Sequence, residues 1–240
     1  MKKFVQKLAF VTTTAFASMS TLAAMPTVSS TAYAADEQSN VYAQVKQALQ
    51  TDYPVTLPKS VAVQSGKHLT AKTSVSTTGY KVVYYETDRH VAVNDPALDT
   101  ISKHVVARIQ LKHYKSEAAA LERVGYENYK QIGGTKLPLG YGLTAYQDAG
   151  AGQLYTSWNE GRWALATHAY TSTPDKGQQL AKRAVRYLES HTLPAPQRFG
   201  AIRLDAVGSN STVAWQLKDN VVTIDKAKHM KLLKIATSVR

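Results

Sequence analysis

The sequence of 240 residues contains no cysteine. A disulfide, a lipid anchor on cysteine and catalysis by a cysteine nucleophile are therefore excluded. Small exported domains often depend on disulfides, but about 200 residues can bury an adequate hydrophobic core without them. The chain also lacks a G-x-S-x-G turn, an S-x-x-K pair and an H-E-x-x-H helix, which excludes the hydrolase classes that carry these motifs. We therefore predict no catalytic residue.

Metal-binding and cofactor-binding patterns are missing as well. The seven histidines show no i, i+4 or H-x-H spacing, so no local zinc motif is present. The segment Gly150-Ala151-Gly152 lacks the third glycine of a dinucleotide-binding loop. We predict neither a metal nor a cofactor, and a metal site assembled from distant segments stays open as an alternative. The histidines are His68, His90, His104, His113, His168, His191 and His229.

The first 34 residues are predicted to be a secretory signal peptide. Three lysines precede an apolar run from Leu8 to Ala24, and the segment ends in the A-x-A site Ala32-Tyr33-Ala34. The run is interrupted by threonine and serine and is shorter than the ~20 residues of a membrane-spanning helix. An uncleaved N-terminal anchor is the alternative. We predict a secreted chain of residues 35–240, released or loosely associated with the cell wall, with no transmembrane segment after cleavage.

Acidic residues are scarce, with 17 Asp+Glu against 29 Lys+Arg. Without Lys2, Lys3 and Lys7 of the predicted signal peptide, 26 basic residues face 17 acidic ones, a net charge of +9. Such a surplus favours anionic partners. Outside a cell these are anionic cell-wall polymers or a membrane surface rather than nucleic acid. The alternative without a specific partner is that the net charge only keeps the chain soluble.

Hydrophobic periodicity divides the predicted mature chain into strands and helices. Residues 80–86 are apolar or aromatic on both sides, which indicates an interior strand. In residues 105–112 apolar and polar side chains alternate, which indicates a strand with one solvent-exposed face. Further strands are predicted within 61–75, 154–169, 213–217 and 221–224, and helices at 39–50, 116–130, 175–190 and 225–239. The segment Leu137-Pro138-Leu139-Gly140 is interpreted as a connection.

Two tryptophans flank a predicted hairpin turn at Asn159-Glu160-Gly161. Trp158 alternates in step with Leu154, and Trp163 with Leu165. Large aromatic side chains in such positions usually form the core, so we predict packing rather than a sugar-binding platform. Trp215 also precedes a turn, at Asp219-Asn220, with a helix following. This repetition suggests two related halves, residues 35–132 and 133–240, although a hairpin followed by a helix is also a common unit of α+β folds.

The predicted fold class is therefore α+β, with an antiparallel sheet and helices packed on one face. The segments DYPVTLP, GKHLTA, GYKVVYYE, AWQLKDNVVTI and LLKIATSV resemble a family of uncharacterised secreted proteins and lipoproteins of Gram-positive bacteria. The C-terminal segment is also similar to extracellular domains of unknown function found beside anti-sigma regulators. The resemblance implies an extracellular α+β domain and transfers no catalytic residue.

Basic residues line the predicted outer faces of the last two helices. Our leading hypothesis is a non-enzymatic exported protein that associates with the anionic envelope through these faces, and an ordinary solvated helix surface is the alternative. A cysteine-free hydrolase of wall polysaccharide, using Glu86 or Asp88, is a second hypothesis. An extracellular sensory or partner-binding module is a third. The predicted anion-binding residues are Lys182, Arg183, Arg186, Lys231 and Lys234.

Overall fold

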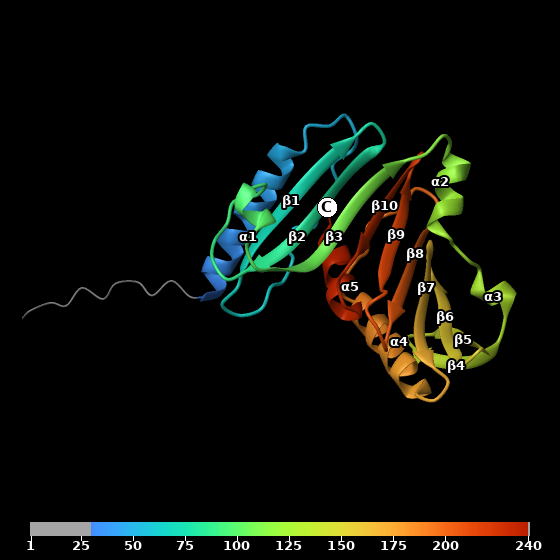
Figure 1. Cartoon of the computed structure of the whole chain (residues 1–240). Helices are drawn as coiled ribbons and strands as arrows, with labels where there is room; N and C mark the ends of the chain where they lie inside the picture. Colours follow the sequence, from blue (N-terminus) through green and yellow to red (C-terminus); the bar gives the residue numbers. More distant parts are fainter. Residues whose placement is uncertain (1–29, 240) are drawn as a thin grey trace, which may run out of the picture.

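A mixed sheet of ten strands runs the length of the molecule (Figure 1). The computed structural model describes the backbone of residues 30–239 and the side chains of residues 36–239. Most of the predicted signal peptide, including its apolar run, lies outside the described residues. The strands are β1 (His68–Ser76), β2 (Gly79–Thr87), β3 (Lys103–His113), β4 (Thr135–Gly140), β5 (Leu143–Gly150), β6 (Gln153–Glu160), β7 (Trp163–Tyr170), β8 (Gly200–Asp205), β9 (Thr212–Leu217) and β10 (Asn220–Asp225).

Helices begin and end the described chain and connect parts of the sheet. The helix α1 begins at Ser30, four residues before the predicted cleavage point, and therefore extends across it. A short 3-10 helix, η1 (Pro96–Asp99), follows β2. The helices are α1 (Ser30–Ala48), α2 (Glu117–Val124), α3 (Tyr129–Ile132), α4 (Pro174–Leu188) and α5 (His229–Thr237).

The strand order is β1-β2-β3-β10-β9-β8-β7-β6-β5-β4. The chain builds β1 to β3 from one edge, crosses to the other edge through α2 and α3, and returns through β4 to β7. After α4, the strands β8 to β10 fill the gap, and β10 pairs with β3. All neighbouring strands are antiparallel except β7 and β8, which are parallel. The predicted antiparallel sheet is therefore wrong at this one pair, where the α4 crossover supplies the long connection that a parallel pair needs.

One face of the sheet, which we call the core face, carries the main hydrophobic core. Alternate residues point to this face across the whole sheet, from the edge strand β1 to the opposite edge strand β4. The helices α1, α4 and α5 pack against the same face. The segment between α1 and β1 also joins this core through the buried Leu57 and Val61. Pro58 pairs with Val239, so this segment is attached to the C-terminal end of the described chain.

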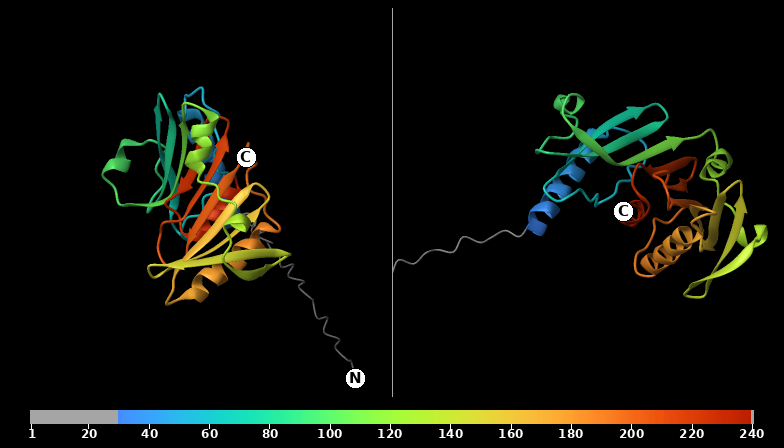
Figure 2. Two further views of the ribbon diagram at one scale, coloured as in Figure 1. Left: turned by 90° about the vertical axis from the view of Figure 1, so that its right-hand side faces the viewer. Right: turned by 60° about the horizontal axis from the view of Figure 1, so that its bottom comes forward.

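The opposite face, the second face, is covered only in part. The short helix α2 buries Ala120 and Val124 against Ala201 and Val221 there. The backbone N–H of Tyr129 in α3 donates to the side chain of Asn159 on the same face. The right-hand view of Figure 2 shows α1, α5 and α4 along one side of the curved sheet and α2 with α3 on the other. Helices therefore pack on both faces, and the prediction of one face is wrong.

All three tryptophans belong to the core, and the packing predicted for Trp158 and Trp163 is confirmed. Trp158 and Trp215 are fully buried, and Trp163 is 6% exposed. The rings of Trp163 and Trp215 lie 6.4 Å apart. Gly161 supplies the positive φ, 55°, of the hairpin loop between β6 and β7. The aromatic pair around this hairpin is thus used for packing rather than for binding.

Other elements differ from the predictions for identifiable reasons. The segment read as a connection is the edge strand β4, which accommodates Pro138 because an edge strand can lack a ladder N–H. The helix expected at 116–130 stops at Gly125, a left-handed C-cap, and only α3 follows. Ser116 caps α2 as expected, accepting from the N–H of Ala119. The predicted repetition of strand, turn, strand and helix is not confirmed, and the sheet runs continuously through residues of both proposed halves.

We predict that Gly200→Ala lowers the free energy of unfolding by about 1–3 kcal/mol. Gly200 lies beside Trp163 in the parallel pair, and an added Cβ would come within 2.5 Å of the indole ring. Because Trp163 is buried and neighbours Trp215, the indole ring must shift within the core to make room for the added Cβ. Urea denaturation measures the effect. Gly150→Ala is the control, since nothing lies within 4 Å of its added Cβ, and a loss of stability there equal to that at Gly200 would contradict the explanation.

Candidate functional site

The five basic residues singled out from the sequence are all exposed on the outer sides of α4 and α5. None of them forms a salt bridge with a described residue. They are exposed because the apolar residues of both helices are buried against the core face. We call Lys182, Arg183, Arg186, Lys231 and Lys234 the basic helix face.

The two helices that carry the basic helix face lie next to each other. The hydroxyl groups of Tyr187 in α4 and Thr237 in α5 are 2.9 Å apart. His229, the first residue of α5, is close enough to Arg183 for the two to interact electrostatically. Burial, followed by the positive charges of Arg183 and Lys228, lowers the pKa of His229. The cations of the basic helix face are therefore carried by two adjoining helices.

A cleft of about 560 Å³ lies on the second face of the sheet, opposite α4. Tyr129 and Ile132 of α3 line one side, and side chains from β5, β6, β7 and β8 line the rest. Tyr155 is 45% exposed and Ile132 is 64% exposed, so aromatic and apolar surface is accessible in the cleft. Polar groups also line the cleft; they are Glu127, Asp148, Gln153, Ser157, His168, Arg203, Asp205 and Asn210.

A histidine and an aspartate in the cleft are joined by a hydrogen bond. Nδ1 of His168 lies 3.1 Å from Oδ1 of Asp205, and Nε2 lies 2.5 Å from Oε1 of Gln153. The imidazole also contacts the rings of Tyr155 and Tyr170. Both ring nitrogens therefore have partners, and these contacts fix the orientation of the imidazole ring. Parallel pairing of β7 with β8 places His168 directly beside Asp205.

Asp205 is held by the loop that follows it. Its carboxylate accepts hydrogen bonds from the backbone N–H groups of Val207, Gly208 and Asn210. Burial raises the pKa of Asp205, but the hydrogen bonds from Val207, His168, Asn210 and Gly208 outweigh it, so the pKa lies below its ordinary value. The ionised carboxylate thus organises one wall of the cleft.

A smaller basic groove of about 370 Å³ lies beside α2, also on the second face. Arg203 lines both this groove and the cleft, and its Nη2 donates to the carbonyl of Gly125. Arg108 is paired with Asp225 in the same groove. No pattern in the sequence predicts this groove, because its cations come from three separate elements, β3, α2 and β8.

The two carboxylates proposed for a hydrolase are already engaged. Glu86 is 5% exposed, accepts a hydrogen bond from the N–H of Gln64 at 3.0 Å, and lies 3.4 Å from Nδ1 of His104. Asp88 is exposed and forms a salt bridge with Lys67. Asp88 therefore lies at a solvated strand end, whereas Glu86 is buried. Among the other carboxylates, burial first and the charge of Glu189 raise the pKa of Glu160, and the neighbouring indole of Trp158 opposes them.

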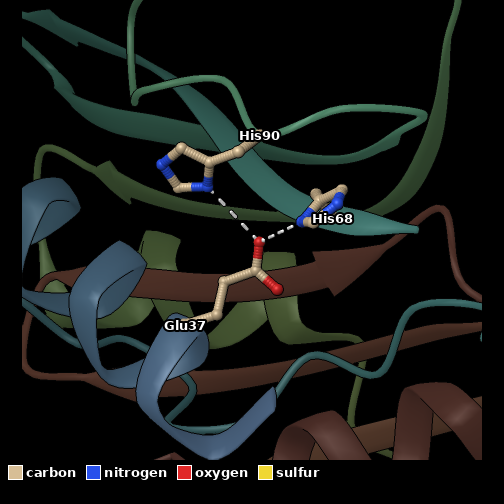
Figure 3. A group of neighbouring side chains, drawn as sticks. All are labelled: Glu37, His68 and His90. Carbon is tan, nitrogen blue, oxygen red and sulfur yellow. Dashed lines mark hydrogen bonds and ion pairs between the residues drawn. The ribbon is translucent and has the colours of Figure 1, made fainter. Parts of the chain in front are cut away.

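One group of side chains has the composition of a metal site, although the sequence predicted none. Glu37 of α1, His68 of β1 and His90 after β2 point toward one another (Figure 3). Their ligand atoms all lie within 4.8 Å of one another, and this is the only such group of three among residues 36–239. Residues 37, 68 and 90 are far apart in the chain, so spacing could not reveal them.

No family model, no curated protein and no solved structure matches this chain. The resemblance to secreted Gram-positive proteins therefore stays a prediction. Among the described helices, none has the length and apolar character needed to cross a membrane.

We predict that Asp205→Asn lowers the free energy of unfolding at pH 7 by about 1–3 kcal/mol, because charged hydrogen bonds to the loop are lost. A lowered pKa in the folded state means that ionised Asp205 stabilises the fold above its ordinary value of 3.8. This contribution disappears as the pH falls through the lowered pKa. The stability difference between wild type and variant should therefore shrink below pH 3.8.

Urea denaturation from pH 7 down to pH 2 measures this difference. Asp52→Asn is the matched control, because Asp52 is an exposed aspartate away from the cleft. We expect its stability to follow that of the wild type at every pH. A constant difference between wild type and Asp205→Asn would contradict the role given to the carboxylate charge.

Proposed function

We propose that this chain is an exported, non-enzymatic protein that attaches reversibly to anionic surfaces of the cell envelope through the basic helix face. The observation that carries the proposal is that two adjoining helices carry five exposed cations, none of which forms a salt bridge with a residue in the described part of the chain. Their partners are cell-wall polymers rich in phosphate or the surface of an anionic membrane. The net positive charge of the chain favours the same partners.

The strength of such attachment follows from the number of cations. A lysine or arginine near an anionic membrane surface contributes about 1 kcal/mol, and the attraction falls off within a Debye length of about 8 Å at physiological salt. Five cations on one surface therefore bind measurably and release readily when salt is raised. Attachment through this surface leaves the second face, with its cleft, directed away from the envelope.

A second candidate function is recognition of a small polar ligand in the cleft, which would make the protein an extracellular binding module. Exposed tyrosine rings beside hydrogen-bonding groups are suited to sugars, because a ring face packs on the sugar and the polar groups meet its hydroxyls. The guanidinium of Arg203, held by the carbonyl of Gly125, supplies a fixed polar group beside the tyrosine rings. Soluble oligosaccharides derived from the wall are the ligands that this chemistry fits best.

The attachment is tested with the triple variant Lys182→Glu/Arg183→Glu/Arg186→Glu. We expect it to bind vesicles of phosphatidylglycerol and the polymer poly(glycerol phosphate) more than about 100-fold more weakly than the wild type, because the loss of three attractions alone gives about that factor and the new repulsions add to it. Wild-type binding should weaken as sodium chloride is raised from about 10 mM to about 500 mM, because the Debye length falls from about 30 Å to less than about 8 Å. Cosedimentation measures both effects.

The control variant is Lys115→Glu/Lys130→Glu/Lys136→Glu, which makes the same change in net charge. These three lysines are exposed and lie outside α4 and α5. We expect this variant to keep most of the binding. Equal loss in both triple variants would mean that net charge alone, and no particular surface, determines adhesion.

Recognition in the cleft is tested by titrating soluble wall oligosaccharides into the protein and following Tyr155 and His168 by NMR. We expect Tyr155→Ala to weaken binding about tenfold, because the stacking surface is lost. Tyr141→Ala is the control, since Tyr141 is 61% exposed in the loop between β4 and β5. Shifts that are absent from the cleft, or equal effects of both substitutions, would count against the binding module.

A further inference from the structure

We propose that Glu37, His68 and His90 form a binding site for a divalent transition metal of the zinc class. Two imidazole nitrogens and one carboxylate oxygen are ligands that zinc prefers, and sites with three protein ligands keep a further position open. The proposal is independent of the attachment to anionic surfaces, because the three residues lie outside the basic helix face.

The ligand atoms of the three side chains lie close to the spacing of a tetrahedral site, all within 4.8 Å of one another. Nδ1 of His68 lies 2.9 Å from Oε1 of Glu37, and Nδ1 of His90 lies 3.5 Å from the same oxygen. With bonds of about 2.0–2.1 Å to zinc, neighbouring ligand atoms of a tetrahedron are about 3.4 Å apart. Figure 3 shows both imidazoles turning the Nδ1 edge toward this one oxygen. Small side-chain movements suffice to place an ion among the three atoms.

The backbone that carries the two histidines is held in place by other interactions. His68 pairs with Thr87 across β1 and β2. The buried hydroxyl of Thr87 lies 3.3 Å from the carbonyl oxygen of His68 and 2.9 Å from that of Arg89. Lys67 and Asp88, the neighbours of these residues, form a salt bridge. The ligands are therefore positioned in advance, which lowers the entropic cost of binding an ion.

Solvent access and location suit an ion that enters from outside. The side chain of Glu37 is 11% exposed, that of His68 27% and that of His90 54%, so the group is buried on one side and open on the other. Cleavage after Ala34 would leave Glu37 as the third residue of the processed chain. A bound ion would then attach the new N-terminal helix to β1 and to the loop after β2.

The experiment uses the protein purified after export, stripped of metal with EDTA, with its N-terminus defined by mass spectrometry. Calorimetric titration with zinc sulfate should show one ion per chain, and added zinc should raise the melting temperature. We expect Glu37→Gln, His68→Ala and His90→Asn each to weaken zinc binding roughly 100-fold, at or beyond the loss seen when a supporting residue is removed. Cobalt bound in place of zinc should show the intense visible absorption of tetrahedral coordination.

His104→Ala is the matched control, because His104 also lies beside a carboxylate, Glu86, at 3.4 Å but has no third ligand. We expect its zinc affinity to equal that of the wild type. Glu37→Gln keeps the size of the side chain and His90→Asn changes an exposed one, and circular dichroism verifies that these variants fold. The proposal is overturned if they bind zinc as the wild type does, if His104→Ala loses as much affinity, or if a chain processed beyond Glu37 binds with unchanged affinity.

Discussion

The parallel pairing of β7 with β8 is the constraint on which most of this molecule depends. It connects the strands that start from the β4 edge with those that complete the sheet beside β3. At the start of this pair, Trp163 lies against Gly200, and no larger residue fits at that position without displacing the ring. The glycine therefore leaves the space that the indole ring occupies over the start of this pair.

Both candidate surfaces follow from this pairing. A parallel connection needs a long crossover, and here the crossover is α4, whose buried side is apolar and whose outer side is basic. On the other face, the same register places His168 next to Asp205 and Ala166 next to Arg203. One pair of strands thus positions the basic helix face on one side of the sheet and the cleft on the other. Attachment and recognition are compatible because they use opposite faces.

The N-terminal part of the molecule is organised around different contacts. The helix α1 packs against β1 and buries Val41 and Val45, and Leu49, directly after the helix, is buried as well. The following segment reaches the C-terminal end of the described chain through Pro58 and Val239. The group of Glu37, His68 and His90 lies where α1 meets the sheet. An ion bound there would stabilise the attachment of α1, a helix that crosses the predicted cleavage point, to the rest of the fold.

Local patterns in the sequence determined most of the elements and the exposure of the predicted basic residues. The spacing of apolar side chains predicts β2, β3 and the helix α4. It also predicts the burial of Trp158 and Trp163 and the exposure of Lys182, because burial follows the periodicity within one element. The same patterns could not identify β4, whose proline suggested a connection, or the parallel register of β8. Nor could they bring His90 to Glu37, or Arg203 to the cleft. Only the tertiary structure decided these, because each depends on contacts between segments far apart in the chain, which leave no period or spacing along it.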